Sequence, residues 1–197
     1  MSGRPDVYIS GDIEADGPIP GPYSMLSLGM TVVGSHGAAG FSAADPTEQT
    51  FYAELRPISD SYDHKALVVS GLDRDRLVRE GTEPAEAMDA AAAWVKRVSR
   101  GGTAVFAGYP AHYDWMWLYW YFLRFGTQGS PFGHSRCLDL KTFYAARARV
   151  PFSDSIKRRM PHELMSGRPH THNALDDAIE QAELAANLLR WDGPRSG

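Results

Sequence analysis

The first regular pattern in the chain is an alternation of apolar residues with small or polar ones, which is the two-residue repeat of a β-strand. Val7 and Ile9 are apolar members of this alternation, and the strand is expected to end before the Gly- and Pro-rich break over residues 17–22. Two further strands are expected over residues 24–33 and 50–55. A loose, glycine-containing connection over residues 34–46 would join them. Three consecutive strands predict an antiparallel meander.

Farther along the chain, apolar residues recur at intervals of three and four, which is the repeat of an amphipathic helix. The predicted helices are residues 67–80, 84–97, a long aromatic helix that begins near Asp114, 141–149 and 174–190. Short strands are predicted over 103–107 and 136–140, and a short helix and loop over the polar, basic residues 153–168. A meander followed by alternating helices and strands predicts an α/β fold with a mixed sheet.

The aromatic helix is apolar around most of its circumference. Leu118, Phe122 and Phe125 recur at helical spacing, and further aromatic residues fill the remaining surface: Trp115, Trp117, Tyr119, Trp120 and Tyr121. Such a helix has to be covered on all sides. We favour packing into the core of the domain, and the alternative is a self-association face that would make the protein a homodimer.

Length and composition limit the class of protein. The 197 residues fit one domain, with flexible ends over 1–5 and 192–197, and 43% apolar with 22% charged residues is ordinary for a globular chain. No apolar run approaches the about 20 residues that span a bilayer, and the N-terminus lacks the apolar segment of a secretory signal. We therefore expect a cytoplasmic protein without a membrane partner, in which the one cysteine, Cys137, is a core residue.

Two carboxylates follow the apolar start of the first strand. Asp12 and Glu14 are two residues apart, so their side chains leave the same face of a pleated strand, roughly 7 Å apart along the chain. Carboxylates this close repel each other, and a hard divalent cation such as Mg²⁺ or Mn²⁺ would convert the repulsion into affinity. The alternative is that both acids lie at a solvated strand end.

His172 and Asp177 lie five residues apart at the start of the last predicted helix. In one continuous helix their side chains would point about 140° apart, so they converge only if His172 lies in the loop before the helix. Asn173 is a suitable N-cap and allows that arrangement. Taken singly, Asp177 could instead complement the helix dipole, and Asp114 could instead cap the aromatic helix.

Together, these acids and the histidine have the chemistry that phosphodiester hydrolysis requires. Several carboxylates hold two cations about 3.5–4 Å apart, one for the attacking water and one for the leaving 3′-oxygen. A base then has to accept a proton from that water. An imidazole, whose ordinary pKa is about 6.5, is suited to this near neutral pH.

Three stretches of the chain resemble the motifs of the DEDDh 3′–5′ exonuclease superfamily, and they span nearly its whole length: Asp12-Ile13-Glu14, Asp114 on a helix after a strand, and His172 followed by Asp177. The third, which continues as Ala-Leu-Asp-Asp-Ala over residues 174–178, is the most specific. The resemblance implies a single exonuclease domain over residues 1–197 with a ribonuclease H-like fold, a mixed β-sheet flanked by α-helices. It also implies that Asp12, Glu14, Asp114 and Asp177 bind metal and that His172 is the general base.

The chain departs from the family pattern in two places. Residues 109–114 read Tyr-Pro-Ala-His-Tyr-Asp, whereas many members have a His-Asn pair before the aspartate. Residues 15–18 read Ala-Asp-Gly-Pro where a Thr-rich turn is common. His170 and His112 compete for the role of base but do not have the family spacing, and we interpret Asp139 and Asp176 as helix caps.

The net charge of −4 argues against a protein that wraps long nucleic acid, but not against one that grips an end. Residues 139–168 reverse this balance, with seven Lys and Arg against three acids. A solvated basic face would explain the excess, and so would phosphate binding. As candidate phosphate-binding residues we select Lys157, Arg158, Arg159 and Arg168.

The sequence therefore predicts an enzyme with two Mg²⁺ or Mn²⁺ ions per active site. It would release nucleoside 5′-monophosphates from the 3′ ends of single-stranded RNA or DNA, with RNA slightly preferred. One alternative is a non-catalytic nucleic-acid-binding module that retains the fold, although binding alone does not need four acids and a histidine. The other is a structural protein assembled through the aromatic helix, which would leave the acids unexplained.

Overall fold

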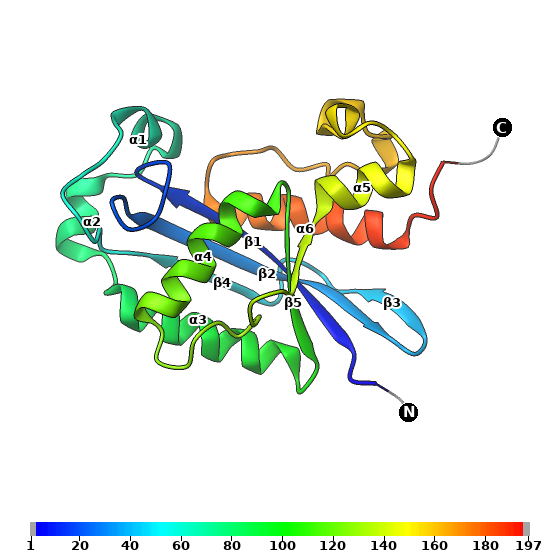
Figure 1. The fold of residues 1–197 in the computed structure, drawn as a ribbon, viewed down its shortest axis with the longest axis horizontal. Coiled ribbons are helices and arrows are strands. Elements are labelled where there is room, and N and C mark those ends of the chain that lie inside the picture. Colours follow the sequence, from blue (N-terminus) through cyan, green and yellow to red (C-terminus); the bar gives the residue numbers. More distant parts are fainter. Residues whose placement is uncertain (1–2, 195–197) are drawn as a thin grey trace.

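The computed structural model describes residues 3–194, so part of the predicted flexible ends, residues 1–2 and 195–197, lies outside the described residues. Within the described part, the chain folds around a six-stranded sheet of order β3-β2-β1-β5-β6, in which β4 also pairs with β2 (Figure 1). The strands are β1 (Asp6–Ala15), β2 (Met25–Gly37), β3 (Gly40–Ala43), β4 (Thr50–Glu54), β5 (Thr103–Gly108) and β6 (Cys137–Asp139). The longer helices are α1 (His64–Ser70), α2 (Arg74–Glu80), α3 (Pro84–Ser99), α4 (Ala111–Phe125), α5 (Leu140–Ala148) and α6 (Ala174–Arg190).

Strand β1 lies inside the sheet and makes it a mixed sheet, because its two neighbours run in opposite directions. It pairs antiparallel with β2 and parallel with β5, while β2 pairs antiparallel with β4. The predicted meander of three antiparallel strands is therefore confirmed, and β5 and β6 extend it in parallel. The alternation that predicted β1 is also confirmed, because Val7 and Ile9 are buried.

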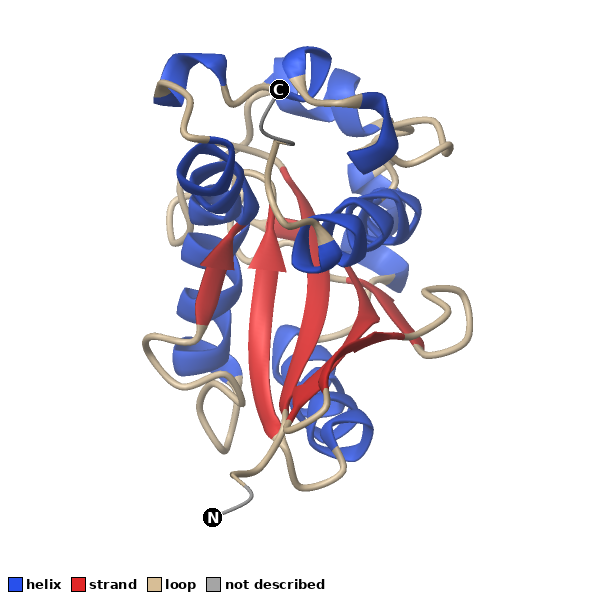
Figure 2. Cartoon of the chain, turned by 90° about the vertical axis from the view of Figure 1, so that its right-hand side faces the viewer, coloured by secondary structure: helices blue, strands red, loops and turns tan. Residues whose placement is uncertain are grey.

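Helices cover both faces of the sheet (Figure 2). Helices α3 and α4 enclose one core, which contains Trp94, Trp117 and Phe106. Helices α5 and α6 enclose a second core, which contains Leu184 and Ala107. Phe106 and Ala107 are neighbours in β5, and they belong to different cores because adjacent strand residues point to opposite faces. Both faces of the sheet are thus buried, as the predicted α/β class requires.

The aromatic helix α4 packs into the core, which confirms the favoured interpretation. Trp117, Leu118, Tyr121 and Phe122 are completely buried. The Tyr121 hydroxyl accepts a hydrogen bond from the backbone N–H of Met25 at 2.7 Å, so its polar end is satisfied inside the protein. Within residues 3–194, no helix has the length and apolar character needed to cross a membrane.

Two segments before α3 differ from the sequence prediction. Residues 67–80 form two short helices because Gly71, with φ of 65°, ends α1, and the Asp73 side chain accepts a hydrogen bond from the N–H of Arg76 to begin α2. Residues 34–46 are not a loose connection, because β2 continues to Gly37 and β3 pairs back onto it with Gly40 opposite Gly37. Gly37 ends β2 and Gly40 begins β3, on either side of the two-residue turn that joins these strands.

Two segments after β5 also differ. Helix α4 begins at Ala111, so Asp114 lies in its first turn and does not cap it. Residues 153–168 contain no α-helix, and three single 3₁₀ turns span this region: Phe152–Asp154, Lys157–Arg159 and His162–Leu164. Pro151 and Pro161 immediately precede the first and third of these turns, and proline can begin a helix but interrupts a longer one.

A glycine in β2 allows α6 to approach the sheet closely. Gly29 pairs with Asp12 across the β1–β2 ladder. A side chain at Gly29 would overlap the backbone of Ala174 and Leu175, at the start of α6. This close approach to β2 brings the first turn of α6, which contains Asp177, beside the neighbouring strand position of Asp12 in β1.

Candidate active site

Four acids from three elements meet beside β1. Asp12 and Glu14 lie in the second half of β1, and their carboxylates approach Asp177 of α6 so that one oxygen of each lies within 4.8 Å of the others. Asp114 reaches the same place from α4, where its Oδ1 accepts a hydrogen bond from the N–H of Ile13 at 3.3 Å. The structure therefore brings together all four acids of the predicted ligand set.

Burial of these acids, together with their mutual proximity, raises their proton affinity. Burial, followed by the charges of Asp114, Glu14 and Asp177, raises the pKa of Asp12 well above its ordinary range, and the ammonium of Lys157 opposes this rise. Burial, followed by Asp177 and Asp114, raises the pKa of Glu14 to about 8. Burial raises the pKa of Asp114 to about 7, although the hydrogen bond from Ile13 acts in the other direction. Without a cation, these acids therefore hold their protons to a higher pH than isolated carboxylates, and the Lys157 ammonium offsets this only in part.

This donor set fits a hard divalent cation. Asp12, Glu14 and Asp177 present only carboxylate oxygens, which Mg²⁺ and Mn²⁺ prefer as ligands. Burial, together with the charges of Asp177 and Asp114, raises the pKa of Glu14, so a positive counter-charge among these oxygens would favour the ionised form that binds metal. A divalent cation would supply that counter-charge.

The raised pKa of Glu14 predicts that the metal-free protein loses stability as the pH rises. The folded state holds the Glu14 proton up to about pH 8, whereas the unfolded chain releases it near 4.5. Folding therefore gains from Glu14 below about pH 4.5 and loses this gain as the pH rises to 8. In EDTA, we expect the Tm of the native protein to fall over this interval and that of Glu14→Gln to fall less.

Thermal unfolding measured from pH 5 to pH 8.5, with EDTA or with Mg²⁺, tests this expectation. Each kcal/mol is worth about 2–4 °C in a domain of this size. Glu48→Gln, which replaces an exposed acid between β3 and β4, is the matched control and should follow the native curve. If Glu14→Gln also follows the native curve in EDTA, the raised pKa assigned to Glu14 is wrong.

The segment before α6 is held on Asp177. The N-cap Asn173 accepts hydrogen bonds from the N–H groups of Leu175 and Asp176, as predicted. The carboxylate of Asp177 accepts hydrogen bonds from the N–H groups of Thr171 and His172, both at 2.8 Å. His172 therefore lies in the loop before the helix, where its φ of 57° turns the chain.

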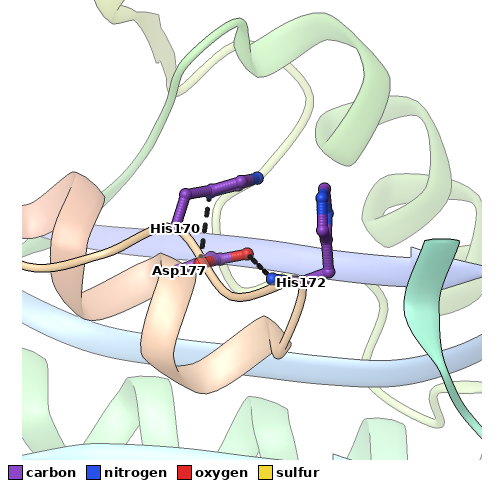
Figure 3. Close-up of side chains that lie close together, drawn as sticks. All are labelled: His170, His172 and Asp177. Carbon is purple, nitrogen blue, oxygen red and sulfur yellow. Dashed lines mark hydrogen bonds and ion pairs between the residues drawn. The ribbon is translucent and has the colours of Figure 1, made fainter.

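The two histidines of this loop contact Asp177 differently (Figure 3). The His170 imidazole lies over Asp177, with Nδ1 3.2 Å from Oδ1. His172 contacts the same carboxylate through its backbone, and its ring extends away from it and meets the His170 ring edge to face, with centroids 4.6 Å apart. His112 is exposed in the first turn of α4. His170, an alternative candidate for the general base, is thus the histidine whose side chain contacts Asp177 in this structure.

Gln181 supports the site, and the sequence analysis did not identify it. Its Nε2 donates to the Ser10 hydroxyl at 3.0 Å and to the carbonyl oxygen of Gly11 at 3.1 Å, while its Oε1 accepts the N–H of Tyr109 at 2.5 Å. These bonds join α6 to β1 and to the connection before α4. A polar residue on the apolar face of α6, one turn after Asp177, was the signal that could have identified it.

Asp139 is a helix cap, as predicted, and it caps two helices. Its Oδ1 accepts the N–H of Thr142 in α5, and its Oδ2 accepts the N–H of Ala111 in α4, both at 2.7 Å. The second bond holds the turn of α4 that carries Asp114. Asp176 was also interpreted as a cap, which is wrong, because Asn173 caps α6 and Asp176 is exposed in its first turn.

The residues selected for phosphate binding are distributed unevenly around the site. The Nζ of Lys157 lies 2.6 Å from Oε2 of the buried Glu180, close enough to Asp12 for its charge to act on that acid. Arg159 forms an ion pair with Asp154, and Arg168 forms one with Glu183. Arg158 is exposed. Lys157 is therefore the member of this set that the structure brings towards the acids.

Comparison with known proteins places the chain in a family. No family model matches it. It is 35% identical over 184 residues to a protein of Escherichia coli named 3′-5′ DNA exonuclease Cap18, and the match covers 91% of this chain and 89% of that protein.

Solved structures agree on the fold. The nuclease domain of 3′hExo, described as a DEDDh family member bound to rAMP, has a TM-score of 0.67 at 17% identity and covers 95% of this chain and 92% of its own. E. coli Exonuclease I in complex with a dT13 oligonucleotide has a TM-score of 0.61 at 14% identity over 92% of this chain. The chain spans only 40% of that structure, and 64% of a 3′-exonuclease structure concerned with histone mRNA stem-loop recognition. With the curated relative, the predicted fold and the four converging acids in agreement, the chain belongs to the DEDDh family of 3′–5′ exonucleases.

Proposed function

We propose that this exonuclease is metal-dependent and hydrolyses single-stranded nucleic acid with two divalent cations and a histidine general base. The observation that carries the proposal is the convergence of Asp12, Glu14 and Asp177, with Asp114 beside them, on one edge of β1. His172 lies on the adjoining loop. The products would be nucleoside 5′-monophosphates.

The acids are suited to hold Mg²⁺ or Mn²⁺. Cations bound there would supply the positive charge that activates a water and stabilises the leaving 3′-oxygen. The protein fixes its donors in advance, since Asp12 and Glu14 lie on an internal strand, and Asp114 and Asp177 lie in the first turns of helices that pack on opposite faces. Gln181 and Asp139 hold those helices in position, so the donors need little rearrangement.

His172 is proposed to accept the proton of the attacking water. Its backbone N–H is held by Asp177 at 2.8 Å, which places the residue beside the acids while its imidazole remains exposed. Rotation of that side chain can bring a ring nitrogen over the acids without a change in the backbone. Because the ring is exposed, the proton can then pass to solvent.

Lys157 is proposed to contact a phosphate of the bound strand. Glu180 is buried and holds the Lys157 ammonium at the edge of the acid group, and the Lys157 side chain is 29% exposed. An ammonium in this position can attract a phosphate that the acids themselves would repel. Arg158, Arg159 and Arg168 remain predictions as phosphate ligands, and the ion pairs of the last two would have to open or extend.

The choice between DNA and RNA as substrate is proposed from the name of the E. coli relative. The E. coli relative is named as a DNA exonuclease, so we propose that single-stranded DNA 3′ ends are substrates. The slight preference for RNA, expected from the sequence, stays a prediction. A homodimer also stays a prediction, as does the alternative of a binding module without turnover.

A panel of 5′-labelled DNA and RNA oligomers of one sequence tests the proposal. With Mg²⁺ or Mn²⁺, each should shorten one nucleotide at a time with release of mononucleotides, while EDTA, a 3′-phosphate and a circular substrate should each prevent it. The same panel with Lys157→Met should give a higher KM with less effect on kcat. Binding without turnover would identify a binding module, and turnover that persists in EDTA would overturn the metal assignment.

A further inference from the structure

A second group of potential metal donors adjoins the acids and differs from them in chemistry. One ligand atom each of His170, His172 and Asp177 lies within 4.8 Å of the others (Figure 3). Two of these donors are imidazole nitrogens, whereas the group of Asp12, Glu14 and Asp177 offers oxygen alone. Asp177 belongs to both groups. The two sites therefore share one carboxylate but prefer different metals.

Two imidazoles and a carboxylate are suited to Zn²⁺ and related transition metals. Zn²⁺ accepts nitrogen at about 2.0–2.1 Å in a tetrahedral arrangement, and it commonly uses three protein ligands and a water. Mg²⁺ prefers oxygen and does not compete for imidazole. This difference in preferred metal allows an experiment to distinguish the two groups, although they share Asp177.

Side-chain rotation alone would bring the three donor atoms to the spacing that a bound metal requires. Ligands of a tetrahedral Zn²⁺ lie about 3.3 Å apart. The His170 Nδ1 and Asp177 Oδ1 atoms already lie 3.2 Å apart, and a ring nitrogen of His172 has to approach these two atoms from within 4.8 Å. His170 is 53% exposed, and His172 is exposed as well, so neither ring has to leave a packed position. The backbone is already in place, because Asp177 holds the N–H groups of Thr171 and His172 at 2.8 Å.

We propose that His170, His172 and Asp177 form an inhibitory site for Zn²⁺ or a similar transition metal. Occupancy would hold the His172 ring on the metal and draw a carboxylate oxygen of Asp177 away from the acid group. The inhibitory effect rests on the proposed function, in which His172 is the base. Binding of the metal does not rest on it.

Co²⁺ absorption tests the binding directly. Four-coordinate Co²⁺ with nitrogen ligands absorbs visible light much more strongly than six-coordinate Co²⁺ in an oxygen site, so the spectrum reports which group is filled. We expect an intense band in the native protein that Zn²⁺ abolishes by displacement. The band should persist in Asp12→Asn and disappear in His170→Ala, whose affinity for Zn²⁺ should fall by more than about tenfold.

Inhibition of hydrolysis by Zn²⁺ tests the functional consequence of metal binding at this site. With saturating Mg²⁺, added Zn²⁺ should stop hydrolysis by the native protein, and the inhibiting concentration should rise by more than about tenfold in His170→Ala. Equal inhibition of both proteins would overturn the inhibitory role, as would intense Co²⁺ absorption without inhibition. A band lost in Asp12→Asn but kept in His170→Ala, or no intense band at all, would overturn the site itself. If the protein shows no nuclease activity, the proposed function fails while the Co²⁺ spectra still decide the site.

Discussion

Asp12→Asn is expected to abolish Mg²⁺-dependent hydrolysis while leaving the fold intact. One carboxylate oxygen of Asp12 lies within 4.8 Å of oxygens of Glu14 and Asp177, and among the neighbouring charges that of Asp114 raises its pKa most, so Asp12 lies at the centre of the acid group. An amide is a poor substitute for an anionic ligand of a hard cation. Loss of several kcal/mol of metal-derived stabilisation corresponds to a fall in kcat/KM of about 10³-fold or more.

Asp177→Asn should be as inactive but should also loosen the loop before α6. The Asp177 carboxylate accepts two backbone N–H groups, one on each oxygen, and an asparagine side chain has a single oxygen to offer them. Hydrogen exchange at Thr171 and His172 should therefore increase in Asp177→Asn and remain native in Asp12→Asn. Asp12→Asn is thus the cleaner test of metal binding.

The control for both substitutions is Asp176→Asn. Asp176 precedes Asp177, carries the same charge, and is exposed in the first turn of α6. It should retain native turnover and native Mg²⁺ affinity by calorimetry. If Asp12→Asn or Asp177→Asn retains near-native turnover, the assignment of the acid group as the metal site is wrong.

The parts of the site that local sequence determines are the parts that could be predicted. The segment from His172 to Asp177 carries its own N-cap and its own spacing, so its loop and helix follow from neighbouring residues. Likewise, the spacing of Asp12 and Glu14 on an alternating strand places both on one face. The resemblance to a known family then connected these segments, which are far apart in the chain.

The supporting contacts could not be predicted because their partners are distant in sequence. Gln181 bonds to Ser10 across 171 positions, and Asp139 bonds to Ala111 across 28. Nothing in the immediate neighbourhood of either residue identifies its partner. Lys157 was selected within a basic segment, yet its pairing with the buried Glu180 depends on how that segment folds back onto α6.

The predicted limits of the helix over residues 67–80 failed for a different reason, because the break comes from residues inside that range. The apolar spacing over residues 67–80 is compatible with one helix, and the break between α1 and α2 depends on Gly71 and Asp73. The adjoining tertiary contact is the ion pair between Arg74 and the buried Asp16, at 3.0 Å. This pair joins α2 to the chain just after β1, which a reading of helical periodicity does not reveal.

His172→Ala is expected to lower kcat by about 10²–10⁴, the usual contribution of general-base catalysis. Its imidazole makes no hydrogen bond to the acids in the described structure, and its link to Asp177 runs through the backbone N–H, which alanine retains. Calorimetric Mg²⁺ affinity should therefore change little. Alanine at this position keeps a φ of 57° at some cost in strain, so the loop has to be checked by hydrogen exchange at Thr171.

His170 provides the decisive comparison because its ring, and not that of His172, contacts Asp177 here, at 3.2 Å. If this contact marks the base, His170→Ala will show the large loss of kcat and His172→Ala will not. If His172 is the base, His170→Ala and His112→Ala will stay close to the native kcat, and only His172→Ala will lose the acidic limb of the pH–rate profile that an imidazole produces. If His172→Ala keeps the native kcat and the native acidic limb, the His172 imidazole does not take part in turnover and His172 is not the base.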